Sequence, residues 1–487
     1  MTVLRRLIFT VWISFICSSS APAQNIPNQL FNQEQSIFRA ACVKVDITPD
    51  KPQWLLGYKE RRSVGVHDKL YHRVVAMDDG KTQFFLISSD VCVISPSFHK
   101  ELCKELESRT GIKAEQVWWT VTHTHSAPEA GPRGLEILFL VEQGRYSHEP
   151  NAEYSRRVIN ELIKAVKQAR SELTAARLGV GTGTSMANVN RRQRNPDGTY
   201  RLGVNPDGPV DRQIGLIRLE RADGSPLALI ANYAVHGTAL GSQNLLITAD
   251  VPGVVAEYVE QKFGAPMLFI QGAMGNIAPI YGTCPDFESS HITEFNALLA
   301  DRILAANQSI HTTTSDVILW TGKTVIETPR KEGLGWVDDL ADYTRTTSSG
   351  TKLVRIPVCL LKINDDIAIW AAPLELFCEI AMNIRNKSPF PFTFYFGLTN
   401  GTLMYLPTKQ AFVEGGYEPS VSPFTELAEQ DFTQGVISYL QRMRLCSVSE
   451  ASTPKYMVKV EHNVRLPMRD GVHLCDRFGG TAAGKNR

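Results

Sequence analysis

The stretch WWTVTHTHSAPEAG, from Trp118 to Gly131, joins an apolar, β-branched run to two histidines that lie two residues apart. The run predicts a buried strand that ends near His123. Because side chains at positions i and i+2 of a strand point to the same face, His123 and His125 are expected to converge. Active sites of open α/β sheets lie at this end of the strands. A single H-x-H pair is more often ordinary packing, so its meaning depends on the rest of the chain.

Strand-like and helix-like segments alternate on both sides of this stretch. Residues 82–93 predict a buried strand, and Ser95-Pro96 then predicts the start of a helix that ends near Gly111. Further helices are predicted for 153–173, 254–263, 293–306, a segment after Pro373 and 426–444; strands for 266–271 and 392–398; and hairpins around Asp223-Gly224 and Asn364–Asp366. We therefore expect an α/β fold with a mixed β-sheet core flanked by helices.

Composition and the N-terminus restrict the class of protein. The chain has 487 residues and a formal net charge of +1, without long runs of one sign, so a nucleic-acid partner is not expected. Arg5-Arg6 precedes an apolar run from Leu7 to Cys17, and Ala21-Pro-Ala23 follows it. This run is shorter than the roughly 20 residues that span a bilayer, and the pattern is typical of a secretory signal peptide over residues 1–23. We expect an exported protein, either periplasmic or secreted.

A third histidine and a glutamate occupy positions similar to that of the His123/His125 pair. His236 ends the apolar run LALIANYAV, and Glu375 follows Pro373, where it is expected to open a helix. A catalytic zinc ion typically takes three protein ligands from histidine and carboxylate side chains. Glu375 could instead be a first-turn glutamate favoured by the helix dipole, and Glu379, one turn later, competes with it as the carboxylate.

Other enzyme signatures are missing. The sequence contains no G-x-S-x-G nucleophile elbow. The glycine-rich segment GVGTGTS, from Gly179 to Ser185, does not have the spacing of a phosphate-binding or dinucleotide-binding loop and predicts a strand and turn.

Several separated motifs occur in a characteristic order. They are KVDITP, GVHDKLY, THTHSAP, NYAVHGTAL, FIQGAMGNIAP, APLELFCEI and NGTLMYLPTKQAFVEGGYEPS. With them, residues 38–445 resemble the N-terminal catalytic domain of neutral/alkaline non-lysosomal ceramidases. The resemblance implies a zinc-dependent hydrolase of linear amide bonds in sphingolipid metabolism, with ceramide as the named substrate. A lipid-like or small N-acyl amide substrate is also compatible with peripheral membrane contact. The immunoglobulin-like domain that follows in the family is not expected after Arg444.

The resemblance also assigns roles to individual residues. It implies that Zn²⁺ is bound by His123, His236, Glu375 and Tyr405, with Leu374 standing where the family has glycine. It further implies catalytic roles for His125, beside the reaction centre, and for Tyr417 and Arg191, which would stabilise the oxyanion.

One position departs from the family pattern. The family segment G-D-V-S-P-N reads GNIAPI here, so that Ala278 replaces a serine regarded as essential, Asn276 the aspartate and Ile280 the asparagine. Because alanine has no hydroxyl group, a serine acyl-enzyme is excluded at this position. A metal-activated water with His125 as general acid or base is the predicted alternative. A metal-dependent esterase or lactonase, and a catalytically inactive relative that binds a lipid or glycan, remain open.

The C-terminal segment has a different pattern. Residues 446–455 are small and polar and predict a linker. Within residues 456–487, VRLPMRDGVHL predicts a hairpin around Arg469–Gly471 and resembles the opening hairpin of α/β-hydrolases of the X-prolyl peptidase and cocaine-esterase type. We predict that this segment is a truncated start of a second domain or a disordered tail.

Overall fold

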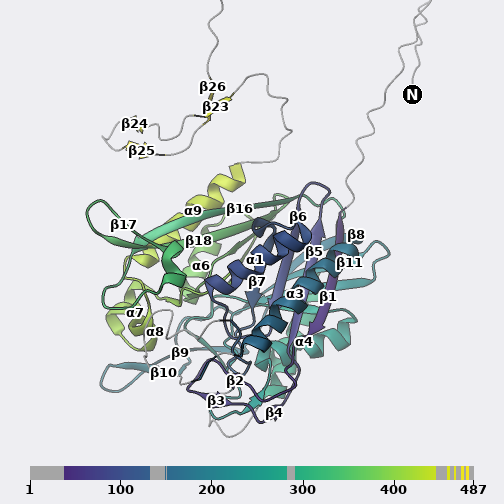
Figure 1. Ribbon diagram of the computed structural model, residues 1–487, viewed down its shortest axis with the longest axis horizontal. Helices are drawn as coiled ribbons and strands as arrows, with labels where there is room; N and C mark the ends of the chain where they lie inside the picture. Colours follow the sequence, from purple (N-terminus) through teal and green to yellow (C-terminus); the bar gives the residue numbers. More distant parts are fainter. Residues whose placement is uncertain are drawn as a thin grey trace, which may run out of the picture. The chain divides into compact units, whose positions relative to one another are not determined.

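A mixed eight-stranded sheet forms the first half of the fold (Figure 1). The computed structural model describes residues 38–131, 148–149, 151–281 and 291–445, and four short strands beyond residue 457. The order of the strands in the sheet is β14 (Met267–Gln271), β12 (Pro226–Tyr233), β11 (Gln213–Arg221), β8 (Thr174–Thr184), β1 (Arg39–Asp46), β5 (Tyr71–Asp78), β6 (Gln83–Ser89) and β7 (Val117–Val121). The pairs β12–β14 and β6–β7 are parallel and the others are antiparallel, so the predicted mixed sheet is confirmed.

A second mixed sheet packs against the first, although the sequence predicted only one. Its strands are β16 (Leu319–Pro329), β17 (Thr344–Thr346), β18 (Lys352–Ile363), β19 (Ile367–Ala371) and β21 (Phe392–Phe396). Alternate side chains face alternate sides of each strand. Ile230 and Ile270 of the first sheet pack with Leu361 and Ile369 of the second in one buried apolar cluster. The central core therefore lies between the two sheets.

Helices cover the outer face of each sheet. On the first sheet lie α1 (Pro96–Thr110), α3 (Ala152–Ser171), α4 (Asp250–Phe263) and α5 (Asp301–Gln308); with the second pack α6 (Cys378–Lys387) and α9 (Ala428–Leu445) (Figure 1). The result is a helix–sheet–sheet–helix arrangement, which agrees with the predicted flanking helices. The predicted helix 293–306 is divided into a 3₁₀ turn (η2, Ile292–Glu294), a π-helical turn (η3, Asn296–Ala300) and α5.

The ends of α1 follow the predicted capping signals. The Ser95 hydroxyl accepts a hydrogen bond from the backbone N–H of Phe98 at 3.2 Å, and Pro96 is the first helical residue. Gly111 ends the helix with φ 72°, a left-handed conformation that glycine adopts without a Cβ penalty.

The glycine-rich segment of β8 is a packing surface. A Cβ atom at Gly179 or Gly181 would lie 2.7–2.8 Å from Ile310, and one at Gly183 would lie 2.7 Å from Ala306. These glycines alternate along β8 and let α5 and the residues after it approach the sheet closely. The segment is therefore a strand, as its spacing predicted.

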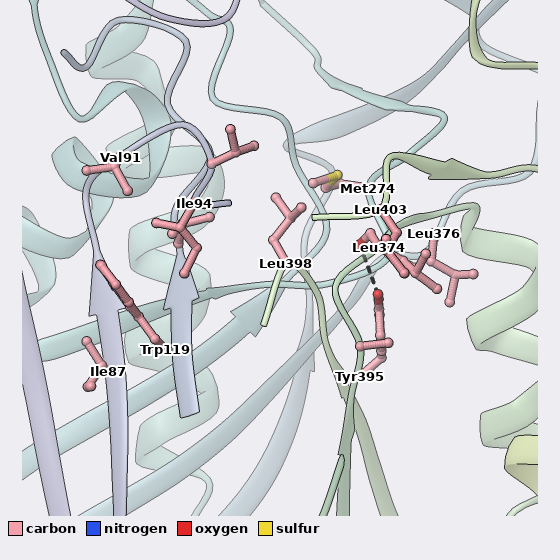
Figure 2. Packing of buried hydrophobic residues seen from close by; sticks show 14 of the residues in the cluster. Ile87, Val91, Ile94, Trp119, Met274, Leu374, Leu376, Tyr395, Leu398 and Leu403 are labelled. Atoms are coloured by element: carbon pink, nitrogen blue, oxygen red, sulfur yellow. Dashed lines mark hydrogen bonds between the residues drawn. The ribbon is translucent and has the colours of Figure 1, made fainter. Parts of the chain in front are cut away.

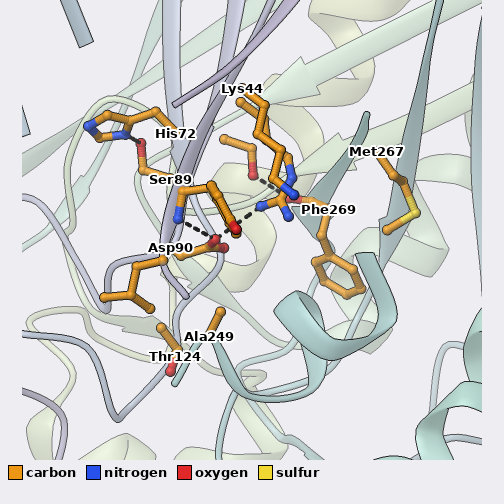
Figure 3. Close-up of polar contacts among 12 residues, drawn as sticks. Lys44, His72, Ser89, Asp90, Thr124, Ala249, Met267 and Phe269 are labelled. Carbon is orange, nitrogen blue, oxygen red and sulfur yellow. Dashed lines mark hydrogen bonds and ion pairs between the residues drawn. The ribbon is translucent and has the colours of Figure 1, made fainter. Parts of the chain in front are cut away.

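Buried charges connect the first sheet to α4 and fix the turn after β6. The Arg73 guanidinium donates to Asp90 Oδ2 at 3.0 Å and to Glu260 Oε1 at 2.7 Å, and its side chain is only 2% exposed. Lys44 Nζ donates to Glu260 Oε2 at 2.6 Å. Figure 3 shows Lys44 and Asp90 of this group. Two carboxylates thus compensate the buried guanidinium, as a buried charge requires. Asp90 begins a turn. The backbone carbonyl groups of the next two residues, Val91 and Cys92, accept hydrogen bonds from His123.

Short elements make up most of the connections between the two sheets and the helices. They are β2 (Trp54–Leu55), β3 (Arg61–Arg62), β4 (Gly65–Val66), β9 (Asn188–Arg194), β10 (Tyr200–Asn205), β13 (Leu246–Ile247), β15 (Ile277–Pro279), β20 (Glu375–Leu376), β22 (Tyr405–Leu406), α7 (Lys409–Glu414), α8 (Tyr417–Val421), and the 3₁₀ turns η1 (Ala114–Gln116) and η4 (Asp338–Tyr343). They carry most of the residues that the sequence singled out as functional. In the described part of the chain, no helix combines the length and apolarity needed to cross a membrane.

Beyond residue 457 the structure describes two strand pairs. β24 (Arg465–Pro467) pairs with β25 (His473–Cys475), and β23 (Val458–Val460) pairs with β26 (Gly479–Thr481), both antiparallel. The β24–β25 pair confirms the predicted hairpin. That this hairpin begins a second domain stays a prediction, and the predicted signal peptide 1–23 and linker 446–455 lie outside the described residues.

Candidate metal centre

His123 lies just beyond β7 and is almost completely buried. Its backbone N–H donates to Val91 O at 3.1 Å, and its Nδ1 lies 2.8 Å from Cys92 O. A carbonyl oxygen only accepts, so Nδ1 carries a proton, and in the neutral ring Nε2 offers its lone pair to a cation. His123 has φ 61°, an uncommon value for a residue other than glycine and one that is enriched at functional sites.

His236 lies at the equivalent position beyond β12 and has the same tautomer. Its Nδ1 donates to Ile277 O at 2.8 Å, which again leaves the Nε2 lone pair available. The two histidine-bearing loops lie side by side, because the backbone N–H of His125 donates to Gly237 O at 2.9 Å. A Cβ atom at position 237 would lie 2.7 Å from His123 O, so glycine is required for this approach.

Glu375 brings a buried carboxylate to both histidines. Its Oε2 lies 3.2 Å from His236 Nε2 and 3.4 Å from His123 Nε2. The predicted helix start at Glu375 is wrong: the residue belongs to β20, which pairs in parallel with β22 so that Glu375 is opposite Tyr405. Its backbone N–H donates to Met404 O at 3.0 Å, which holds the segment extended. α6 begins only at Cys378.

Leu374 helps to position Glu375. Its side chain is fully buried beside Leu376 and Leu403, and the hydroxyl of Tyr395 donates to its carbonyl oxygen at 3.0 Å (Figure 2). Leu374 is therefore an apolar anchor for the strand that carries the carboxylate.

The donor set fits a zinc ion. Two imidazole nitrogens and one carboxylate oxygen are a typical protein contribution to a catalytic zinc site. Ligand atoms of a tetrahedral site with bonds of about 2.0–2.1 Å lie about 3.3–3.4 Å apart, close to the two distances from Glu375 Oε2 to the Nε2 atoms of His123 and His236. The other carboxylate oxygen of Glu375 is buried and has no hydrogen-bond partner among the described residues.

The charges at this site are strongly coupled. Burial lowers the pKa of His123, but the neighbouring Glu375 carboxylate and Cys92 together raise that pKa to about 10. Burial and the charge of Arg191 lower the pKa of His236 to about 3. Without a cation, the buried carboxylate of Glu375 is thus compensated by one charged imidazole, that of His123. A divalent ion would supply the positive charge instead.

Cys92 forms a second group with two of these histidines, which the sequence did not indicate. Its Sγ lies 3.9 Å from His123 Nδ1, and Cys92, His123 and His125 together could also hold a metal ion. However, His123 Nδ1 already donates to the Cys92 carbonyl oxygen. The group that contains Glu375 is therefore the better candidate.

His125 lies against the candidate metal group. Its Nε2 is 3.2 Å from His123 Nε2, and its ring is more exposed than that of His123. Burial, followed by the neighbouring imidazoles, lowers the pKa of His125 well below the usual value, so a neutral ring is favoured. Gly57, with φ 112°, packs against this ring, and a Cβ atom there would lie 2.5 Å from it. The fit fixes His125 beside the metal group.

The remaining predicted site residues surround the same group. Arg191 on β9 places Nη1 3.0 Å from His236 Nε2, so this guanidinium and a metal ion would compete for one lone pair. The Arg191 guanidinium carbon lies 5.4 Å from the centre of the Tyr405 ring, which is 5.7 Å from that of Tyr417. All seven residues singled out from the sequence thus come together. Their individual roles stay predictions.

The segment that carries Ala278 is buried and structural. Ala278 is in β15, opposite Val189 of β9, and the preceding carbonyl, that of Ile277, holds His236. Asn276 donates to Glu379 Oε2 at 2.7 Å and accepts from the backbone N–H of Cys378 at 3.0 Å. The carboxylate of Glu379 therefore contacts Asn276, while that of Glu375 contacts the histidines, which separates the two competing carboxylates.

Comparison with known proteins shows which family and which relatives this chain resembles. The family model described as "Neutral/alkaline non-lysosomal ceramidase, N-terminal" matches residues 38–285. The chain is 25% identical over 259 residues to a neutral ceramidase of Pseudomonas aeruginosa, a match covering 50% of this chain and 37% of that relative. It is 26% identical over 223 residues to neutral ceramidase B of Dictyostelium discoideum, covering 44% and 30%. The matches thus span about a third of these relatives' length.

The fold is similar over a longer stretch than the sequence. The crystal structure of the Pseudomonas aeruginosa neutral ceramidase matches with a TM-score of 0.68 at 17% identity, covering 91% of this chain and 78% of that one. Three site residues, Glu375, Tyr405 and Tyr417, lie after residue 285, beyond the family-model match. The geometry alone brings them to the histidines.

Proposed function

Because this chain belongs to the neutral/alkaline non-lysosomal ceramidase family, we propose that it is a zinc-dependent hydrolase of linear amide bonds. Its proposed substrates are N-acyl amides of the ceramide kind, as the names of its relatives suggest. We also propose that it acts after export, directed by the predicted signal peptide 1–23.

One observation carries the proposal. The buried carboxylate of Glu375 meets the Nε2 atoms of both His123 and His236, although these residues come from three different loops and strands. Backbone carbonyl groups fix the tautomers of both histidines, as is usual for metal ligands, whose second nitrogen donates to a carbonyl or carboxylate. Such an arrangement presents three acceptor atoms to one point.

Each residue around the metal group has a proposed role in amide hydrolysis. A bound Zn²⁺ would lower the pKa of a water molecule and polarise the substrate carbonyl. His123, His236 and Glu375 would hold it, with Tyr405 as the fourth proposed ligand. His125, neutral and beside this group, would accept a proton and return it to the leaving amine. Arg191 and Tyr417 would donate hydrogen bonds to the developing oxyanion, an effect worth about 3 kcal/mol per donor.

No serine is required by this proposal. Ala278 removes the hydroxyl group that the family pattern has at this position, while the backbone next to it still holds His236. The same replacement favours one competing function, a catalytically inactive relative that binds a lipid or glycan. An esterase or lactonase with the same metal site is the other alternative.

A matched pair of substrates tests the proposal against both alternatives. Zinc-loaded protein is assayed with an N-acyl amide and an ester that carry the same acyl chain, together with the Ala278→Ser variant. We expect measurable amide turnover by the natural sequence and a change of less than about threefold in Ala278→Ser, since the added hydroxyl has no assigned role. Ester turnover alone would support the esterase, and binding of both substrates without turnover would support the inactive relative. A rate gain of about 100-fold in Ala278→Ser would contradict the serine-free mechanism.

A further inference from the structure

We propose that Glu418 is a positioning residue that holds Arg191 and Tyr417 in place beside the metal group. The inference rests on the proposed function, because it concerns the groups that would stabilise the oxyanion. Nothing in the sequence pattern singled out this glutamate, which directly follows Tyr417 in α8.

Glu418 binds two neighbouring arginines with its two carboxylate oxygens. Its Oε1 accepts from Arg191 Nε at 2.9 Å, and its Oε2 accepts from Arg192 Nη1 at 2.9 Å. The Glu418 side chain is only 1% exposed, and those of the two arginines are 9% and 6% exposed. In such surroundings both arginines need a charged partner, and charge-assisted hydrogen bonds are short and directional.

This pairing decides which donors of Arg191 remain for a substrate. The Nε–H group of Arg191 donates to Glu418, and its Nη1 lies 3.0 Å from His236 Nε2. Its Nη2 is buried and makes no hydrogen bond among the described residues. Because the guanidinium is planar, fixing Nε also fixes the direction of the Nη2 donor. Glu418 thereby fixes the direction of this donor without touching the reacting atoms itself.

The same carboxylate attaches α8, and hence Tyr417, to β9. α8 follows Gly415 and Gly416, which have φ 71° and 93°, and such glycines give the chain freedom at this point. Arg192 adds to the attachment by donating to Glu414 Oε2 at 3.1 Å and to Gly415 O at 2.8 Å. Arg191 and Tyr417, which come from distant parts of the sequence, are therefore positioned by one carboxylate.

The Glu418→Gln variant tests this role. Glutamine keeps the size of the side chain but removes its charge and turns an NH₂ group toward one of the two arginines. We expect kcat to fall by about 30- to 100-fold, while KM changes by less than about threefold and the zinc content is unchanged. The affinity for a phosphonate analogue of the tetrahedral intermediate, measured by calorimetry, should fall by the same factor as kcat.

Two further variants keep the result interpretable. Glu414→Gln changes a carboxylate that accepts from Arg192 and Gln410 but does not touch Arg191, and it is 21% exposed. Because the glutamine oxygen can still accept from Arg192, this variant should change kcat by less than about threefold. Glu418→Asp keeps the charge but retracts the carboxylate by one methylene, and it should show an intermediate loss if Glu418→Gln does not fold.

The outcomes separate the two proposals. If the natural sequence hydrolyses the amide and Glu418→Gln does so with unchanged kcat, only the role of Glu418 is refuted. The same holds if substrate and analogue affinities fall equally, because that would show a merely structural role. A zinc-loaded natural protein without amide turnover would refute the proposed function and this inference together.

Discussion

Replacing His123 by alanine is expected to lower kcat/KM for amide hydrolysis by at least about 10³-fold. A Lewis-acid metal contributes several kcal/mol of transition-state stabilisation, which corresponds to a loss of this size. The imidazole also lies 3.4 Å from Glu375 and 3.2 Å from His125, so its removal disturbs both the metal group and the proposed general base. Zinc affinity should fall by more than about 100-fold, because even the loss of a group that only hydrogen-bonds to a metal ligand costs about 10- to 100-fold. Kinetics and zinc titration measure the two effects.

His291→Ala provides the control for the loss of a histidine. The His291 side chain is 35% exposed and pairs with Glu294 on the surface. This variant should bind zinc and turn over substrate like the natural sequence. If His123→Ala kept more than a tenth of the activity while His291→Ala was unaffected, His123 would not be a ligand of the catalytic metal.

Replacing Glu375 by glutamine is expected to have an effect of similar size. The change keeps the volume of a fully buried side chain but removes the negative charge that faces both histidines. A neutral amide is a poor partner for a divalent cation in a buried site, so we expect a loss of zinc affinity of more than about 100-fold and of about 10³-fold in kcat/KM. Isothermal titration with zinc and steady-state kinetics measure both quantities.

Glu379→Gln is the matched control, four residues later in the same segment. The carboxylate of Glu379 accepts a hydrogen bond from Asn276 and lies apart from the histidines. Because burial raises the pKa of Glu379, replacing it by a neutral side chain should perturb the protein less. Equal losses of zinc affinity in the two variants would show that the carboxylate assignment is wrong.

The histidines could be predicted because the signal that places them is local. β7 and β12 are mostly apolar strands, and they end two and three residues before His123 and His236. Strand periodicity therefore indicated His123 and His236 at a common edge. The alternation of helices and strands likewise predicted mixed sheets flanked by helices. The pattern of a buried strand does not say which sheet it joins, so the division into two packed sheets was missed.

The surroundings of Glu375 show why local signals fail elsewhere. Pro373 followed by a glutamate is typical of a helix start, but pairing with β22, thirty residues away in the sequence, holds the segment extended. Glu418 was missed for a related reason: a glutamate after Tyr417 is unremarkable until β9 brings two arginines to it. Cys92 matters through its backbone carbonyl, which no side-chain pattern reveals.

The most direct measurement of the central claim is amide turnover by the purified protein before chelation, after removal of metal, and after addition of one equivalent of Zn²⁺, with metal content determined in parallel. The proposed centre of His123, His236 and Glu375 predicts about one zinc ion per chain, loss of turnover on chelation and its recovery on reloading. Full turnover by a protein that holds no stoichiometric metal would contradict the account.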